Sequence, residues 1–203
     1  MRRSKLVILP LLGLLIVPSS VLNAQGRRGL VELPPEGTRR GFWLAGGFGY
    51  GKESFRFGSE PFFDNAEKPV FAFRMGGTPN QRLRLGGEIV TFVNPLTDED
   101  GFRITETLTS LNLIGQFYPM PAAGFFLKGG AGIGVSASSV EGGNTLSETG
   151  FAVQYGVGYD IRLSRSLALT PTVEMIRHRF TKTGDDTLHE RLLHFGVALT
   201  WQK

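Results

Sequence analysis

The chain has 203 residues and a formal net charge of +4, and its 28 glycines are about twice the ordinary share. No three-residue glycine period is present, which excludes collagen, and 41% apolar with 20% charged residues argues against disorder. The absence of cysteine excludes disulfides, CxxC redox chemistry and thiolate zinc sites.

The first 24 residues have the pattern of a secretory signal peptide. Arg2, Arg3 and Lys5 precede an apolar run from residue 6 to 17, and a small residue, Ala24, ends the segment. The run is shorter than a transmembrane helix needs, although a short membrane anchor is the alternative. Removal of this segment leaves 19 basic against 18 acidic residues. No nucleic-acid partner is therefore expected, in spite of a sequence pI near 9.6.

Residues 25–40 predict a flexible periplasmic leader, because they are rich in Pro, Gly and Arg without periodicity. From Gly41 onward, large apolar residues alternate with small or polar ones, as Phe42, Leu44, Phe48 and Tyr50 illustrate. The alternation predicts eight strands in a barrel domain of residues 41–203, over residues 41–51, 71–76, 83–93, 110–117, 125–135, 151–162, 167–175 and 193–201.

The connections between these segments alternate in length. Long ones cover residues 58–68, 95–104, 137–148 and 181–190, and short ones cover residues 78–82, 119–124 and 164–166. An antiparallel meander with this alternation is typical of an outer-membrane barrel, which has short periplasmic turns and longer extracellular loops. The fold class predicted is all-β, an eight-stranded antiparallel transmembrane up-and-down barrel.

A soluble lipocalin-like binding barrel is the alternative, and Gly41-Phe42-Trp43 matches the G-x-W start of that family. A lipocalin places its large apolar residues inside. Here the second face of the strands is mostly Gly, Ala, Ser and Thr, which suits a narrow lumen better than a solvent-facing surface. The pattern therefore favours the membrane barrel.

Four segments, GFWLAGGFGYG, LRLGGEIVTF, GFAVQYGVGYDIRLS and LHFGVALTW, resemble strands of the small bacterial outer-membrane β-barrel proteins of the OmpA transmembrane-domain and opacity-protein type. The resemblance covers the chain from Gly41 onward. It implies export to the cell outer membrane and contact with the barrel-assembly machinery. Members of the family usually end on an aromatic residue that serves as an assembly signal, and here Trp201 stands two residues before the end.

Most of the predicted strands carry at least one charged residue on the face toward the lumen. Buried charges persist when they are paired, so we expect ion pairs that close the lumen. The alternative is a narrow channel for ions or small solutes. The residues of this predicted lumen charge network are Arg74, Arg84, Glu88, Lys128, Asp160, Arg162 and Glu174.

Enzymatic chemistry has little support in the sequence. His178, His189 and His194 lack zinc-ligand spacing, and no nucleophile signature is recognisable. We expect no enzyme activity, no cofactor and no metal site, with His194 as a hydrogen-bonding residue of the lumen.

Charged residues also follow a pattern at the predicted outer surface, both in the long connections and on the strands next to them. Each long connection carries a net charge of −2, which serves solubility or binds bridging divalent cations. Below these connections, five cations on the first, seventh and eighth strands face outward. They predict a basic rim that binds phosphates of outer-membrane lipids, lipopolysaccharide among them. These residues are Lys52, Arg56, Arg177, Arg179 and Arg191.

Taken together, these features predict an outer-membrane protein with a structural or surface-exposed role in the cell envelope. The monomer is the favoured oligomeric state. Fold alone identifies no ligand for the loops.

Overall fold

The structure is a computed structural model that describes residues 39–97, 101, 103–140, 145–181 and 187–203. The predicted signal peptide and almost all of the predicted leader lie outside the described residues. Among the described residues, no helix is long and apolar enough to cross a membrane.

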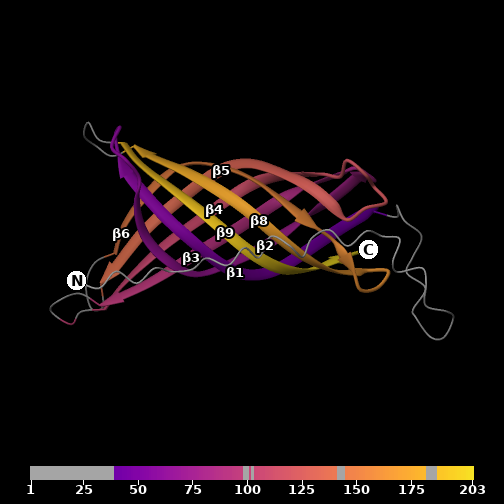
Figure 1. Cartoon of the computed structure of the whole chain (residues 1–203), viewed down its shortest axis with the longest axis horizontal. Helices are drawn as coiled ribbons and strands as arrows, with labels where there is room; N and C mark the ends of the chain where they lie inside the picture. Colours follow the sequence, from indigo (N-terminus) through magenta and orange to yellow (C-terminus); the bar gives the residue numbers. More distant parts are fainter. Residues whose placement is uncertain (1–38, 98–100, 102, 141–144, 182–186) are drawn as a thin grey trace, which may run out of the picture. The chain divides into compact units, whose positions relative to one another are not determined.

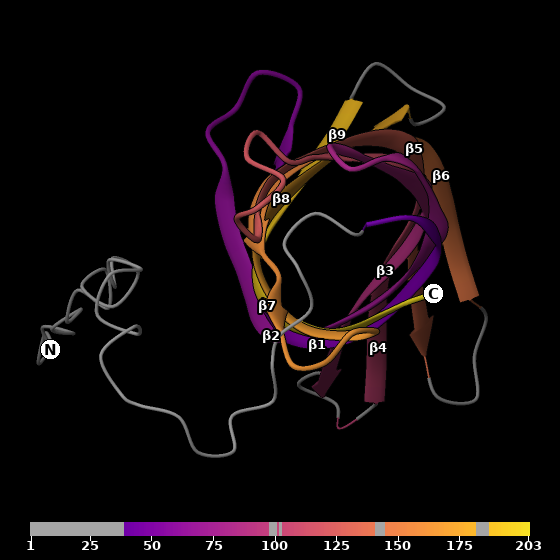
Figure 2. The same ribbon diagram turned by 90° about the vertical axis from the view of Figure 1, so that its right-hand side faces the viewer.

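The described chain is a single antiparallel sheet that closes on itself (Figures 1 and 2). Each strand pairs with its sequence neighbours, and β1 pairs with β9 to complete the ring. The short β7 continues β6 beyond Asp160, and both pair with β8. The strands are β1 (Gly41–Phe57), β2 (Phe63–Asn80), β3 (Leu83–Thr97), β4 (Arg103–Phe117), β5 (Phe125–Val140), β6 (Thr145–Tyr159), β7 (Ile161–Arg162), β8 (Leu167–Thr181) and β9 (Thr187–Gln202).

This arrangement confirms the prediction of an all-β, eight-stranded antiparallel barrel, with β6 and β7 counted as one strand. The connections after β2, β4 and β7 lie at one end, here called the turn end, at the right of Figure 1. The connections after β1, β3, β5 and β8 lie at the opposite end, here called the loop end. The C-terminus is at the turn end, where the Lys203 backbone N–H donates to the Phe42 carbonyl at 3.1 Å.

The strands extend further toward the loop end than the apolar alternation predicts. The first connection, for example, was expected over residues 58–68, but β2 already begins at Phe63. Backbone pairing continues there because neighbouring strands satisfy each other's N–H and C=O groups whatever the side chains are. As a consequence, Glu148 and Glu190, which we expected in loops, belong to β6 and β9.

The two faces of the barrel differ as the strand pattern predicts. Large apolar side chains point outward and are exposed, with Phe48 at 71% and Leu113 at 78% of their maximal accessibility. The inward face holds buried polar and charged residues together with glycine. A lipocalin has the opposite distribution, so the outer surface of this barrel is built for contact with hydrocarbon.

The outward apolar surface has the height of a membrane core. On β9 it begins at Trp201 and ends where Arg191 replaces the apolar residues. For a tilted strand, this ten-residue step corresponds to about 25 Å along the barrel axis, the usual height of the lipid-facing band. Trp201 itself faces outward at the turn end, paired with Leu44 and Leu167.

Inward-facing glycines let the strands coil into a narrow barrel. A Cβ atom on Gly49 would lie 2.1 Å from the Phe195 carbonyl oxygen, and one on Gly132 would lie 1.9 Å from the Leu111 carbonyl oxygen. By contrast, a Cβ atom on the outward-facing Gly46 would meet nothing within 4 Å. The excess of glycine in the sequence is therefore tied in part to the small radius of the lumen.

Candidate functional site: the lumen and the outer rim

Four charged side chains meet in the middle of the lumen, and all four belong to the predicted lumen network. Arg74 on β2 pairs with Glu88 on β3, and its Nη2 lies 2.7 Å from Glu174 Oε1 on β8. Lys128 Nζ on β5 lies 2.6 Å from Glu88 and 2.7 Å from Glu174 Oε2. Two cations and two anions thus alternate across the lumen, so the central cluster is neutral.

Polar neighbours complete this central cluster. Gln154 donates to Glu88 and accepts a hydrogen bond from Asn112 Nδ2 at 2.8 Å. His194 Nε2 lies 3.3 Å from Glu174 Oε2. Glu88 and Glu174 are each 1% exposed. Their carboxylates are stabilised by the paired cations and the surrounding donors, because isolated buried charges would be strongly unfavourable.

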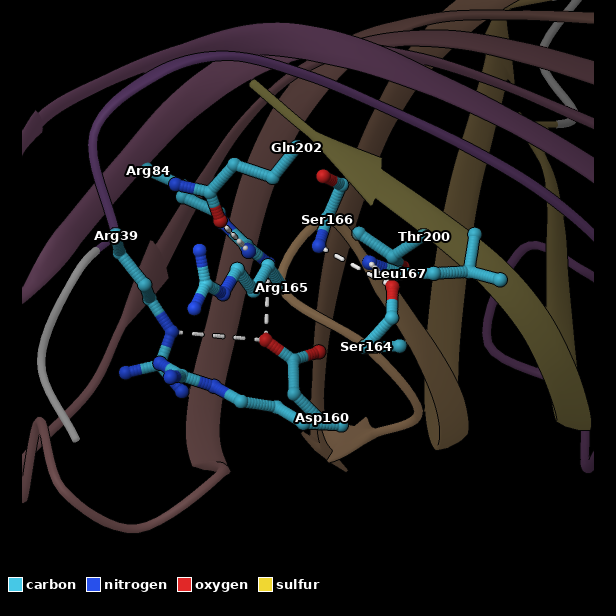
Figure 3. A pocket seen from close by; sticks show the side chains of 11 residues that line it. Arg39, Arg84, Asp160, Ser164, Arg165, Ser166, Leu167, Thr200 and Gln202 are labelled. Carbon is cyan, nitrogen blue, oxygen red and sulfur yellow. Dashed lines mark hydrogen bonds and ion pairs between the residues drawn. The ribbon is translucent and has the colours of Figure 1, made fainter. Parts of the chain in front are cut away.

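A second charged cluster occupies the turn end of the lumen (Figure 3). Arg84 Nη1 lies 3.0 Å from Asp160 Oδ2 and 2.6 Å from the Tyr118 hydroxyl. Arg39 Nε lies 3.6 Å from the same Asp160 oxygen, and the Arg39 guanidinium stacks on the Tyr118 ring at 3.8 Å. A cavity of only about 30 Å³, room for about one water, remains beside this cluster.

Two residues at the turn end differ from what the sequence suggests. Arg162 is half-buried at the edge of this small cavity, and no ion pair between described residues includes it. Arg39, which falls in the predicted flexible leader, is 2% exposed and donates to the carbonyls of Pro121 and Ala123. The position of Arg39 depends on its contact with Pro121, which is 82 residues away in the chain, and no local sequence pattern predicts this contact.

An apolar cluster fills the lumen on the loop-end side of the central network. Val90 and Phe92 follow Glu88 along β3, and Ile176 follows Glu174 along β8. Each of these three side chains is at most 1% exposed. The complete cluster consists of Val70, Val90, Phe92, Leu108, Ile176, Phe180, Leu188 and Leu192.

The five predicted rim cations come together on the adjacent strands β8, β9 and β1. All of them lie near the edge of the apolar band that is closer to the loop end. In the β8–β9 register Arg177 is directly opposite Arg191, and Arg179 is opposite His189, which in turn is opposite Arg56 on β1. Lys52 differs from the others, because its Nζ pairs with Asp64 Oδ2 at 2.6 Å.

The guanidinium groups of the rim rest on aromatic rings instead of carboxylates. Arg191 and Arg56 lie 4.2 Å and 4.8 Å from the centre of the Phe62 ring, and Arg177 lies 5.6 Å from that of Tyr155. Within the described ranges, no carboxylate forms an ion pair with these groups or with Arg179. The rim therefore holds four cations that form no ion pair with a described carboxylate, although Asp64 is close enough to Arg191 to interact with it electrostatically.

The histidines are separated in space. His178 Nε2 lies 2.6 Å from Ser110 Oγ, His189 faces outward, and His194 is in the central network. In the part of the chain that the structure describes, no group of three or more His, Asp or Glu side chains is arranged to hold a metal ion.

A closed eight-stranded antiparallel barrel with an apolar exterior and an ion-paired interior has the architecture of the small transmembrane barrels of bacterial outer membranes. The chain is similar in structure to Neisserial surface protein A, with a TM-score of 0.51 and 17% identity over 78% of this chain and 96% of that one. The attachment invasion locus protein Ail of Yersinia pestis gives a TM-score of 0.47 and 15% identity, over 78% of this chain and 99% of that one. No family model and no curated protein matches the sequence.

Proposed function

We propose that this protein resides in the bacterial outer membrane and has a structural, surface-exposed role in the envelope, with no enzymatic activity. The proposal places the turn end toward the periplasm and the loop end toward the outside, because outer-membrane barrels have short periplasmic turns and longer extracellular loops. The observation that carries the proposal is the central cluster of Arg74, Glu88, Lys128 and Glu174, which spans the lumen from four different strands.

Two further features support a closed lumen. The apolar cluster lies on the loop-end side of the central charges, and an ion that crosses it would lose its hydration without finding a polar partner. The Arg84–Asp160 pair and Arg39 occupy the turn end. A narrow channel for ions or small solutes is the competing function, and it requires a path through all three layers.

Conductance of the refolded protein in planar lipid bilayers tests the proposal. We expect no reproducible single-channel steps from the wild type. A variant with Arg74, Glu88, Lys128 and Glu174 all replaced by Gly should also show no steps, because the apolar cluster and the Arg84–Asp160 pair still close the lumen. Heat-modifiable migration in gels verifies that both proteins are folded. Regular steps from the folded wild type would establish the channel function instead.

We also propose that the basic rim binds phosphate groups of outer-membrane lipids, with lipopolysaccharide as the source of those phosphates. Its four guanidinium groups form no ion pair with a described carboxylate, and they lie at the loop-end edge of the apolar band, where lipid phosphates are expected. This contact would anchor the barrel in the outer leaflet, which agrees with a structural role.

A further inference from the structure

A cavity of about 250 Å³ lies at the loop end of the barrel, and neither the central network nor the basic rim uses it. Its floor includes the buried side chains of Phe92, Leu108 and Leu188, whereas Asn65 and Phe57 at its edge are exposed. The cavity is therefore closed toward the membrane centre and open toward the loop end.

Three carboxylates from three different strands line this cavity: Glu53 on β1, Glu106 on β4 and Glu190 on β9. Each accepts a hydrogen bond from a neutral donor. Asn65 Nδ2 donates to Glu53 at 3.0 Å, Asn94 Nδ2 donates to Glu106 at 2.9 Å, and Ser136 Oγ donates to Glu190 Oε1 at 3.3 Å. None of the ion pairs between described residues includes any of the three.

The second carboxyl oxygen of Glu190 is the feature that indicates a ligand in the cavity. Glu190 is 6% exposed, and its Oε2 atom is buried without a hydrogen-bond partner among the described residues. A buried carboxyl oxygen with no hydrogen-bond partner is unfavourable in either protonation state, and such groups normally have a partner that is protein, water or ligand. Because Glu190 lines the cavity, a cationic ligand in the cavity is well placed to supply that partner.

Among the described residues, the ionisable groups around the cavity are mainly acidic. Glu148 on β6 adds a fourth carboxylate close enough to influence Glu190. Lys68 on β2, opposite the inward-facing Gly51, forms no ion pair with the three carboxylates. His178, opposite Glu190 on β8, is neutral near pH 7, since burial lowers its pKa to about 4. Arg56 and Arg191 lie on the outer face of the sheet.

We propose that this cavity binds an organic ammonium ion, with its charged nitrogen among Glu53, Glu106 and Glu190 and its hydrocarbon part against Phe55 and Phe92. Carboxylates supply charge-assisted acceptors for N–H donors. The faces of aromatic rings attract cations and also bury alkyl or aryl groups. The volume suits a small organic cation much better than a bare metal ion, which would leave most of the apolar wall empty.

The protonation of Glu190 agrees with this assignment. Burial, followed by the charge of Glu53, raises the pKa of Glu190 to about 8, and burial also raises the pKa of Glu53. An ammonium ion in the cavity favours the ionised carboxylate. Binding should therefore release a proton near pH 7, and the affinity should increase as the pH rises toward about 8.

Titration of the refolded full chain with phenethylammonium tests the proposal. The methyl signals of Leu108 and Leu188 in ¹³C-labelled protein should shift in a saturable manner, whereas the lipid-facing Leu113 should not respond. Neutral 2-phenylethanol has almost the same shape and should bind at least tenfold more weakly. Glu190→Gln and Glu106→Gln should each weaken the affinity for phenethylammonium about tenfold or more. The exposed loop variant Glu60→Gln should bind like the wild type.

A second variant, Ser138→Leu, narrows the cavity without removal of a charge and should also abolish binding, provided that heat-modifiable migration shows it folded. Equal binding of 2-phenylethanol, or full affinity in folded Glu190→Gln, would overturn the proposal. So would displacement of phenethylammonium by equimolar Mg²⁺, which would indicate a metal site. These outcomes are independent of bilayer conductance, so they separate this proposal from that of a closed lumen.

Discussion

Arg177 on β8 and Arg191 on β9 are directly opposite each other in the strand register, with no carboxylate bound to either among the described residues. Two cations in directly opposed positions of a sheet destabilise it. The Phe62 and Tyr155 rings next to them offer only weak compensation. An anion bound between the two guanidinium groups would reduce this repulsion, which supports the proposal that the rim binds lipid phosphate.

This relationship predicts the effect of lipopolysaccharide on stability. Addition of lipopolysaccharide should raise the thermal unfolding temperature of the wild type. In the Arg177→Gln/Arg191→Gln double variant the gain in unfolding free energy should fall by about 2 kcal/mol, since each cation near an anionic lipid surface contributes about 1 kcal/mol. In neutral detergent the double variant should be at least as stable as the wild type. Arg82→Gln, at the turn end, is the matched control. Equal gains in all three proteins would make the rim ordinary surface.

Removal of one member of the central network should be costly. Glu88→Gln leaves Arg74 and Lys128 with one carboxylate between them, so we expect a loss of about 3–5 kcal/mol in the free energy of unfolding. Urea titration of the protein in lipid vesicles measures the loss. The double variant Glu88→Gln/Lys128→Met restores the charge balance and should recover part of it. If the double variant loses the sum of the two single effects, the charges do not act as one network.

Two glycines on β1 should respond oppositely to the same substitution. Gly49→Ala places a methyl group against the Phe195 carbonyl inside the barrel, and we expect it to cost about 1–3 kcal/mol of unfolding free energy. Gly46→Ala adds the same methyl group on the open outer face and should be neutral or stabilise by up to about 1 kcal/mol. The same urea titrations compare them. Similar losses in both would show that strand propensity, and not the narrow lumen, sets the need for glycine.

Stability should fall as the pH rises between about 6.5 and 8. The folded protein keeps the proton on Glu190 up to a pKa of about 8, whereas the unfolded chain releases it near 4.5. The unfolded state therefore binds fewer protons in this window, and the free energy of unfolding decreases by up to about 1.4 kcal/mol per pH unit. His178 acts in the opposite direction, but only between about 4 and 6.5, because burial lowers its pKa.

Glu190→Gln isolates this effect. The variant has no proton to release at this position, so its stability should be nearly constant from pH 6.5 to 8, measured by urea unfolding at several pH values. Glu53, whose pKa burial also raises, leaves a smaller slope in the same direction. A wild-type profile that is equally flat would show that Glu190 is ionised in the folded protein.

The strand pattern was sufficient to predict the barrel, because alternation with period two assigns each side chain to one of two faces. Phe48 lies between Gly47 and Gly49, and Phe195 lies between His194 and Gly196, all of which point inward. This local regularity is enough to specify eight strands and an apolar exterior. The inward charged residues of the central and turn-end clusters could be listed in the same way, with the exception of Arg39, but the acidic residues of the loop-end cavity were missed. The limits of the strands could not be predicted, since β2 and β9 continue by backbone pairing after the apolar alternation has stopped.

By itself, the sequence determined which side chains face the lumen and which face the lipid, since that depends only on position along a strand. Only the closed barrel decided which of them meet. Arg74 and Glu174 are 100 residues apart in the chain, and the register of the ring brings them within hydrogen-bonding distance. In the closed barrel Glu190, which was expected in a loop, is buried on β9 and lines the loop-end cavity. Closure also places the Arg39 guanidinium against the Tyr118 ring. Such contacts depend on strand stagger and closure, which no local pattern encodes.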